Sequence, residues 1–338
     1  MKPVKIGLIG CGKQAVKHIS GFKKIPGVTV ILGDTETQTA RTLAGKEGLA
    51  YVNDPQEIFR DPSINAVDIC VPTPSHAPLI RDALNAGKSF FCEKPLCETM
   101  EEARDIQQVA DQKKLAGMVG YVYRFSPIFE LGKRLFEDVP STGHSAVLGK
   151  ITYAFLRLGG RGGHQAWKHM KASGGGAMNE MMVHMIDLAI WYFGRVKEAQ
   201  LLGNMLIRPE RPVGGKLEKV DGEDFVLARL KMENGVEVFV QSDLLTPSFS
   251  QYVEVEGENG SFFGSIQPEV PSYVYCEEPA AGYPAGRTPV NFGYINIFEA
   301  QMAAFVRSVR MGSSAAKSSI HDSILLFEAV TALKGNMR

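Results

Sequence analysis

Val4-Lys5-Ile6-Gly7-Leu8-Ile9-Gly10-Cys11-Gly12-Lys13-Gln14-Ala15 is the stretch that decides the fold of this chain. The apolar run 4–9 predicts a buried parallel strand, and a helix is expected after the glycines, with Ala15, Val16, Ile19 and Phe22 on one face. Gly10 permits a tight turn, and Gly12 lets the backbone approach a pyrophosphate. An ordinary turn is the alternative, but the strand before and the helix after the glycines favour a dinucleotide-binding turn.

The composition limits the classes of protein to consider. The chain has 338 residues, 44% of them hydrophobic, which is more than one compact domain usually holds. The 37 basic and 37 acidic side chains balance, which argues against nucleic acid or an anionic membrane as the main partner. No apolar run approaches the ~18 residues that span a bilayer, and a strand starting at Val4 leaves no room for a signal peptide. Five cysteines are expected as reduced thiols in the cytoplasm.

The first part of the chain alternates strands and helices. Strands are expected at 28–33, near 51, and at 66–71, 89–92 and 117–121, and helices at 35–47, 55–60, 76–86 and 100–114. Gly48 is expected to end one helix, and Thr99-x-x-Glu102 is a capping box. Repeated βα units predict an α/β domain with a doubly wound parallel sheet (the Rossmann type) over residues 1–122.

After residue 122 the pattern changes to one typical of an α+β domain. Strands are expected at 150–158, 196–202, 225–232, 236–242, 252–256 and 261–266, with hairpin turns at 233–235 and 258–260. Helices are expected at 127–136, 177–193, 295–311 and 319–333, and a long surface loop at 267–293. Residues 123–338 are therefore predicted to form a second domain on a mostly antiparallel sheet.

Asp34 ends the second predicted strand, about 20 residues after Gly12, where a carboxylate meets the ribose hydroxyls of NAD and repels a 2′-phosphate. Glu36 adds negative charge nearby. The alternative is a solvated acid at a strand end or at the start of a helix. The position favours NAD, with NADP use left open.

Phe90-Phe91-Cys92-Glu93-Lys94-Pro95 places a lysine at the carboxyl end of a parallel strand, where doubly wound sheets bind ligands. The Lys94–Pro95 bond is a candidate for the cis form. On composition alone, a surface Glu–Lys pair in a turn is favoured.

A third stretch, residues 173–187, begins with Gly174-Gly175-Gly176, which is expected to be a flexible lead-in to a helix. On that helix Glu180, His184 and Asp187 would share a face. A histidine beside a carboxylate is a plausible proton acceptor near neutral pH. A core histidine is the first alternative, and a metal site that includes His164 and His169 is the second.

Five motifs in this order resemble one family. They are Gly10-x-Gly12, Pro72-Thr73-Pro74-Ser75-His76, Glu93-Lys94-Pro95, Tyr123-Arg124-Phe125, and Gly174-Gly175-Gly176 followed by His184-x-x-Asp187. Over essentially the whole chain the sequence is similar to the glucose–fructose oxidoreductase / inositol dehydrogenase (Gfo/Idh/MocA) family. The resemblance implies a dinucleotide-binding domain, a second domain with an open antiparallel sheet, and NAD(P)-dependent oxidation or reduction of a sugar, cyclitol or related polyol. It also implies a homo-oligomer, a dimer or a tetramer.

The resemblance also implies roles for individual residues. Lys94 and His184 match the catalytic lysine and histidine of the family, whereas Glu180 falls where most members have aspartate and Met182 replaces a common glycine. The expected cofactor-binding residues are Gly10, Gly12, Lys13, Gln14, Asp34, Thr73, His76, Glu93 and Lys94. Arg124 and His184 are the substrate contacts that the resemblance implies, and no metal ligand is assigned. Trp167 and Lys168 are added as expected substrate contacts because they lie in a Gly-rich loop just before the helix of His184, with Arg161, His164 and His169 as further candidates; a solvated loop is the equally plausible alternative.

These assignments lead to a mechanism with two alternatives. His184 would accept the hydroxyl proton, Lys94 would orient the hydroxyl and stabilise developing alkoxide, and Glu180 would support them. The first alternative is a lyase or glycosidase that retains NAD and oxidises its substrate only transiently. The second is a non-catalytic sensor of the same fold, against which the presence of both Lys94 and His184 argues.

Overall fold

The structure is a computed structural model that describes residues 2–161, 166–213, 216–312 and 316–335. The chain forms two compact units, Met1–Phe125 with Asn296–Ile324, and Ser126–Ile295 with Leu325–Arg338. The second unit was predicted to hold the whole of 123–338. This division differs because the segment Asn296–Ile324 returns to the first unit, where its helix joins the core.

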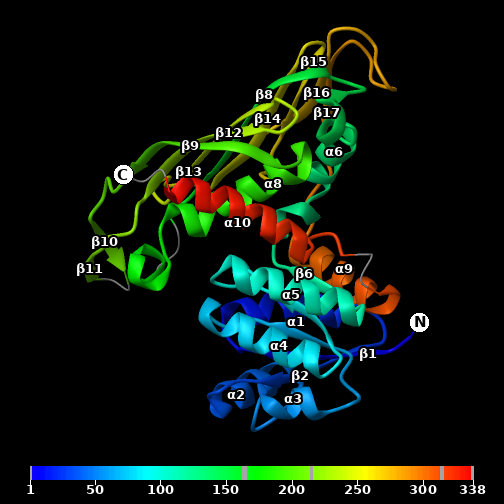
Figure 1. The fold of residues 1–338 in the computed structure, drawn as a ribbon, viewed down its shortest axis with the longest axis vertical. Coiled ribbons are helices and arrows are strands. Elements are labelled where there is room, and N and C mark those ends of the chain that lie inside the picture. The colour runs from blue at the N-terminus through cyan, green and yellow to red at the C-terminus, as the bar shows by residue number, and fades with distance from the viewer. Residues whose placement is uncertain (1, 162–165, 214–215, 313–315, 336–338) are drawn as a thin grey trace. The chain divides into compact units, whose positions relative to one another are not determined.

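The first unit contains a six-stranded parallel sheet in the order β3-β2-β1-β4-β5-β6, which confirms the predicted Rossmann-type architecture (Figure 1). Its strands are β1 (Val4–Ile9), β2 (Val28–Gly33), β3 (Ala50–Tyr51), β4 (Ala66–Ile69), β5 (Ser89–Cys92) and β6 (Gly117–Val119). The order of strands reverses between β1 and β4. The carboxyl ends of strands beside such a reversal are where doubly wound sheets bind ligands.

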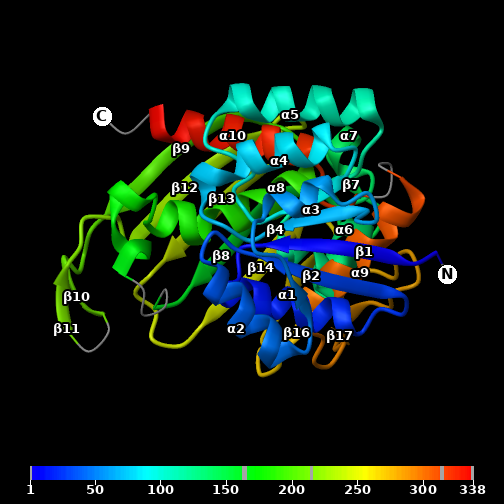
Figure 2. The ribbon, with the colours of Figure 1, turned by 90° about the horizontal axis from the view of Figure 1, so that it is seen from below.

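Helices cover both faces of this sheet, with α1 and α2 on one side and α4 and α5 on the other (Figure 2). Their bounds are α1 (Lys13–Lys23), α2 (Thr37–Glu47), α3 (Gln56–Arg60), α4 (His76–Asn85) and α5 (Met100–Lys113). Gly48 ends α2 in the left-handed conformation, and Thr99 and Glu102 form the predicted capping box at the start of α5. Both signals are local, which is why the sequence showed them.

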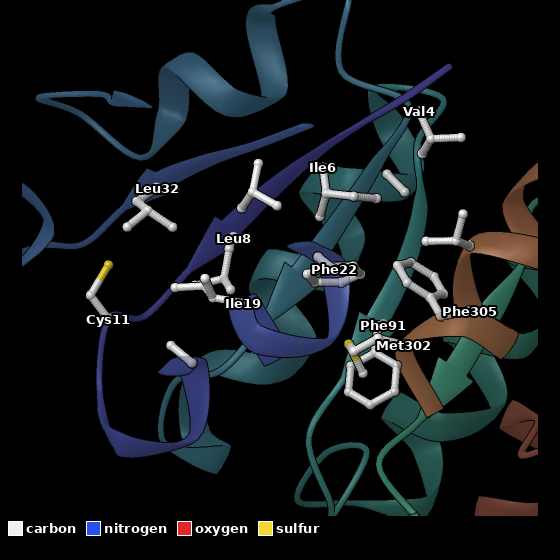
Figure 3. Close-up of a cluster of buried hydrophobic side chains, with 14 of the residues drawn as sticks. Val4, Ile6, Leu8, Cys11, Ile19, Phe22, Leu32, Phe91, Met302 and Phe305 are labelled. Carbon is white, nitrogen blue, oxygen red and sulfur yellow. The ribbon is translucent and has the colours of Figure 1, made fainter. Parts of the chain in front are cut away.

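Helix α9 (Ile297–Met311) completes the core of the first unit. Met302 and Phe305 are fully buried and lie beside Phe91 of β5, whose ring centroid is 5.6 Å from that of Phe305 (Figure 3). A Cβ on Gly21 of α1 would lie 2.9 Å from the Met302 side chain, so α1 and α9 pack closely. Removing α9 would expose this apolar surface, and this is why 296–324 belongs to the first unit.

The second unit is built on a mixed, mostly antiparallel sheet whose main path is β17-β16-β15-β14-β8-β13-β12-β9. Its strands are β7 (His144–Ser145), β8 (Gly149–Gly159), β9 (Val196–Met205), β12 (Phe225–Met232), β13 (Glu237–Asp243), β14 (Ser250–Gly257), β15 (Gly260–Gly264), β16 (Ser272–Cys276) and β17 (Gly286–Val290). The pair β8–β13 is parallel. The two predicted hairpin turns join β12 to β13 and β14 to β15, as expected.

One prediction about this unit was wrong, and one ribbon was not predicted. The expected loop 267–293 contains β16 and β17, which extend the sheet because β16 pairs with β15 and β17 pairs with β16. A ribbon of β10 (Glu210–Val213) and β11 (Lys216–Lys219) was not foreseen either. Proline lies within β10 and β17 (Pro212 and Pro289). Proline argues against a strand in sequence, but it is compatible with an edge strand, and β17 ends the sheet path.

The helices of the second unit are α6 (Pro127–Leu135), α7 (Val139–Thr142), α8 (Val183–Phe193) and part of α10 (Ile320–Gly335). Helix α8 is buried along most of its length, including Met185, Ile186 and Phe193. A π-helical turn, Met178–Met182, precedes it. Within the described ranges, no helix is both long enough and apolar enough to cross a bilayer.

Candidate active site

The turn after β1 has the geometry that its glycines predicted. Gly10 adopts φ +95°, and a Cβ there would lie 2.6 Å from the carbonyl oxygen of Cys70. Gly12 is the N-cap of α1, and a Cβ on it would meet nothing within 4 Å. The turn therefore packs tightly against β4 at Gly10 and leaves space beside Gly12. This arrangement fits a dinucleotide whose pyrophosphate approaches the backbone at the start of α1.

Asp34 lies directly after β2 and joins this turn. Its Oδ2 accepts a hydrogen bond from the backbone N–H of Cys11 at 2.8 Å, and its Oδ1 accepts one from the N–H of Glu36 at 2.9 Å. Asp34 is half-buried. Burial, together with Asp34, raises the pKa of the Cys11 thiol to about 12, so this cysteine is no thiolate nucleophile at neutral pH.

The other predicted cofactor residues occupy different environments. Lys13 is exposed on the first turn of α1, and Thr73 is half-buried in the short helix Thr73–Ser75 that follows β4. The Gln14 amide donates to Glu93 Oε1 at 2.9 Å. The side chains of Lys13 and Thr73 are therefore at least partly accessible, whereas the Gln14 amide is bound to Glu93.

His76 differs from its predicted role as a lining residue. The side chain is 1% exposed, with Nδ1 2.7 Å from the carbonyl oxygen of Pro95 and Nε2 2.8 Å from that of Val71. Both ring nitrogens thus lie within hydrogen-bond distance of backbone carbonyl oxygens. His76 therefore ties the loop after β4 to the turn after β5.

Lys94 follows β5 at the carboxyl edge of the sheet, as predicted, and its peptide bond to Pro95 is cis. The preceding Glu93 accepts the Lys94 backbone N–H at 3.3 Å through Oε2. Both side chains are half-buried. The edge of the first unit therefore presents a lysine beside a carboxylate that is itself fixed.

Arg124 does not fit its expected role as a substrate contact. Its side chain is 1% exposed, and its Nη1 lies 3.1 Å from both Asp322 Oδ2 and the carbonyl oxygen of Lys317. Tyr121 is similarly buried and donates its hydroxyl to Ser323 at 2.9 Å. These contacts attach residues 317–323 to the end of the first unit's sheet. A guanidinium used in this way is structural.

The glycines before the π-helical turn are a packed junction and not the flexible lead-in that was expected. A Cβ on Gly175 would lie 2.5 Å from the carbonyl group of Lys168, and Gly176 has φ +109° with a Cβ position 2.4 Å from Glu223. The Glu223 carbonyl and carboxylate accept the N–H groups of Ala177 and Met178. The junction therefore fixes where the next helix begins.

Glu180 and Lys168, predicted separately as catalytic support and substrate contact, form an ion pair with 2.8 Å between Nζ and Oε2. The Lys168 ammonium also lies 5.3 Å from the ring centroid of Trp167, whose side chain is 45% exposed. Glu180 lies in the π-helical turn and not in the α-helix expected over 177–193. A carboxylate, an ammonium and an exposed indole face are thus gathered at the helix that carries His184.

His184 is half-buried in the first turn of α8, and Asp187 is 1% exposed one turn later. His169 is 3% exposed, and its carbonyl oxygen accepts the N–H of Gly222. Arg161 is exposed. His164, another candidate from the sequence, lies outside the described residues. The structure therefore groups Trp167, Lys168 and Glu180, with His184 one helical turn beyond Glu180.

Comparison with known families agrees with this arrangement. Residues 4–121 match an oxidoreductase family with an NAD-binding Rossmann fold, and residues 144–263 match the GFO/IDH/MocA C-terminal domain. The chain belongs to the GFO/IDH/MocA family. It is an oxidoreductase, and its dinucleotide is NAD, as the turn at Gly10–Gly12 and the position of Asp34 indicated.

Two relatives and one solved structure illustrate this membership. Levoglucosan dehydrogenase from Pseudarthrobacter phenanthrenivorans is 27% identical over 77% of this chain and 73% of its own length. Myo-inositol 2-dehydrogenase from Thermotoga maritima is 26% identical over 98% of this chain and 96% of its own. A structure of levoglucosan dehydrogenase with NADH and levoglucosan has a TM-score of 0.84 at 21% identity, covering 99% and 97% of the two chains. It shows the same fold.

Sequence reasoning missed His18 and Asp68, which are both fully buried beside Gln14 and Glu93. Val16 was expected on the buried face of α1 but is 38% exposed, whereas His18 is on that face. The spacing 15, 18, 19, 22 was the available signal, because residues three and four apart share a helix face. Asp68, a charge inside an otherwise apolar strand, was the second signal.

Proposed function

We propose that this protein oxidises a secondary hydroxyl of a compact polyhydroxylated ring, a sugar or a cyclitol, and transfers the hydride to NAD. The observation that carries the substrate class is the group Trp167, Lys168 and Glu180 at the start of the helix that carries His184. Charged side chains of opposite sign suit several hydroxyls, and an exposed indole suits the apolar face of a sugar ring. The names of two relatives, levoglucosan dehydrogenase and myo-inositol 2-dehydrogenase, point the same way.

The proposed chemistry divides the work between cofactor and protein. NAD supplies the hydride acceptor. His184 accepts the hydroxyl proton in its neutral form, and Lys94 donates a hydrogen bond that orients the hydroxyl and stabilises negative charge on its oxygen. Lys168 neutralises Glu180, so we assign Glu180 to substrate hydroxyls and to fixing Lys168 instead of to proton transfer.

Cofactor binding is proposed for Gly10, Gly12, Lys13, Asp34, Thr73 and Lys94. Asp34 favours NAD over NADP, because a carboxylate facing the ribose repels a 2′-phosphate. Gln14 and Glu93 act indirectly, because they hydrogen-bond each other.

The test is a screen of sugars, anhydrosugars and inositols with NAD and with NADP, following NADH absorbance and substrate consumption in parallel. We expect stoichiometric NADH with at least one compact polyol, and its loss in both Lys94→Ala and His184→Ala. If the substrate is consumed but NADH does not accumulate, the protein is not a dehydrogenase, and a lyase or glycosidase that retains its NAD is indicated. If the protein binds NADH but oxidises no compound of the screen, the result would contradict the dehydrogenase and favour a non-catalytic sensor.

We also propose that the protein is a homo-oligomer. Phe155, Tyr252, Phe263 and Tyr273 form a ladder across β8, β14, β15 and β16, with ring centroids 5.4–6.2 Å apart, and Arg287 lies 4.4 Å from the Tyr273 ring. All four rings are only half-buried within the chain. Light scattering should give a mass that is a multiple of 36.9 kDa. Tyr252→Lys should lower this mass, whereas the control Tyr294→Lys, at an 86% exposed position, should leave it unchanged. A monomeric wild type would contradict this.

All five cysteines are free thiols, as expected from their number and placement. Because unpaired buried thiols persist in reducing compartments, we propose that the protein works in the cytoplasm.

A further inference from the structure

A buried ionic cluster lies under the candidate cofactor edge of the first unit. It consists of His18 from α1, Asp68 from β4, Cys70 just after β4, and Glu93 just after β5. His18 and Asp68 are both fully buried. The mechanism proposed above uses neither of them. Buried charges are costly unless each has a partner, so such a cluster calls for an explanation.

The geometry around His18 determines which form of its ring fits. Nδ1 lies 2.9 and 3.2 Å from the two oxygens of Asp68, and Nε2 lies 3.1 Å from Glu93 Oε1. A neutral imidazole carries one N–H, so its other nitrogen would direct a lone pair at a carboxylate oxygen. The imidazolium form donates to both carboxylates. It also places a cation between two buried anions, which removes their repulsion.

The surroundings of His18 support the charged form. Burial by itself lowers the pKa of His18, but the charge and hydrogen bond of Asp68, with a further contribution from Cys70, raise it well above its ordinary value. Burial by itself raises the pKa of Glu93, but His18, then Gln14 and Lys94, lower it to about 2. Phe91 of β5 presents its ring at 89° to His18, with 5.2 Å between centroids. The titratable groups facing His18 are thus Asp68, Cys70 and Glu93.

The bridge continues to Lys94. Glu93 receives His18 and Gln14 on Oε1 and the Lys94 backbone N–H on Oε2. A Cβ on Gly120, the residue after β6, would lie 3.0 Å from Glu93 Oε2, so the backbone there leaves the carboxylate little room to move. Asp68, His18 and Glu93 therefore form a chain of alternating charge, anchored in β4 and ending at the lysine proposed to orient the substrate.

We propose that His18 is a positioning residue: its imidazolium bridges Asp68 and Glu93 and thereby fixes the turn that carries Lys94 at the carboxyl edge of the sheet. The role assigned to Lys94 rests on the proposed function. The bridge itself does not, because it is defined by contacts within the first unit.

A metal ion is a poorer occupant for this cluster than a proton. His18 Nδ1, Asp68 and Cys70 offer ligand atoms within 4.8 Å of one another. Burial and Asp68 raise the pKa of Cys70, however, and Nδ1 already has the Asp68 carboxylate at hydrogen-bond distance. A structural zinc site ordinarily has four protein ligands, and this cluster supplies only three, from His18, Asp68 and Cys70.

The first measurement reads the charge of His18 without reference to activity. Full-length protein labelled with ¹⁵N-histidine is titrated by NMR, and the His18 signals are assigned by their loss in His18→Gln. We expect both ring nitrogens to remain protonated up to about pH 8 in the wild type, well beyond an ordinary histidine. In Asp68→Asn the same signals should titrate at least one pH unit lower. A neutral wild-type ring at about pH 8, or one equivalent of zinc in the purified protein, would overturn the bridge.

The second measurement reads the position of Lys94. In ¹⁵N-lysine-labelled protein, the Lys94 amide signal is assigned by its loss in Lys94→Arg. It should move in both His18→Gln and Asp68→Asn but stay in place in Ile19→Val, a matched change at a buried neighbour on α1. An unmoved signal in both variants would refute the positioning role even if His18 is charged.

Turnover supplies the third readout. With a polyol that the wild type oxidises, kcat should fall at least tenfold in Asp68→Asn. Its remaining activity should decrease further as pH rises through the His18 titration, because the neutral ring releases Glu93. Ile19→Val should keep the wild-type pH profile. If no polyol is oxidised by the wild type, the proposed function fails while the two NMR measurements still decide the bridge.

Discussion

The two glycines of the first turn should respond to the same substitution in opposite ways. In Gly10→Ala, the new Cβ would lie 2.6 Å from the Cys70 carbonyl oxygen, and the residue would have to keep φ +95°. The left-handed backbone costs about 1–2 kcal/mol, and forcing an atom into a packed site costs about 1–3 kcal/mol. We expect the first unit to lose about 2–5 kcal/mol of stability, which lowers its midpoint by about 4–20 °C.

In Gly12→Ala, by contrast, the new Cβ meets nothing within 4 Å and φ is −80°. Stability should change by less than about 1 kcal/mol, because only an N-cap preference is affected. The methyl group occupies the space proposed for the pyrophosphate, so the Kd for NADH should rise at least tenfold, equivalent to about 1.4 kcal/mol.

Calorimetry and fluorescence titration with NADH measure the two effects separately. The reasoning is refuted if Gly12→Ala binds NADH as tightly as the wild type, because the backbone approach at Gly12 would then be wrong. Wild-type stability in Gly10→Ala would show that the turn does not pack against Cys70.

Three more predictions follow from the site. Asp34→Ser should reduce the preference for NAD over NADP in kcat/KM, and a wild type that prefers NADP would contradict the assignment of Asp34. Lys168→Met and Glu180→Gln should couple by about 0.5–3 kcal/mol in a double-mutant cycle on unfolding, whereas additive effects would show that their ion pair is not formed in solution. Because the pKa of Glu93 is lowered to about 2, its ion pair contributes stability above the unfolded value of about 4.3, and this is lost as pH falls toward 2. The free energy of unfolding, measured with urea, should therefore fall more between about pH 6 and 3 in the wild type than in Glu93→Gln. The exposed Glu278→Gln is the control and should behave like the wild type.

The sequence was sufficient for elements that local signals define. The turn at Gly10–Gly12, the capping box at Thr99 and the hairpins at 233–235 and 258–260 depend on neighbouring residues, and all appear in the structure. Strands β16 and β17 were missed because the pairing of β16 with β15, on which β17 then builds, is a tertiary contact. Pro289 also argued against a strand where the edge strand β17 lies. Helix α9 was assigned to the wrong unit because its periodicity shows an apolar face but not the core it enters.

The candidate site was predictable in its residue types and less so in its contacts. Lys94 appears at the sheet edge and His184 on a helix, as the motifs indicated. Arg124 and His76 proved to be buried and tied to protein groups, because a motif shows that a residue matters without showing what it touches. The pairing of Lys168 with Glu180 joins two segments whose separation the π-helical turn and the packed glycines set.

The central claim, hydride transfer to NAD with His184 as the base, is tested most directly by the pH dependence of kcat/KM for polyol oxidation in the wild type and in His184→Ala. A neutral histidine is required to accept the proton, so the wild-type value should rise with pH as the ring is deprotonated. His184→Ala should lose that limb and turn over about 10²–10⁴-fold more slowly, while its Kd for NADH stays within about threefold of the wild type, a difference below 1 kcal/mol. Near-normal turnover in His184→Ala, with the pH limb retained, would contradict the account.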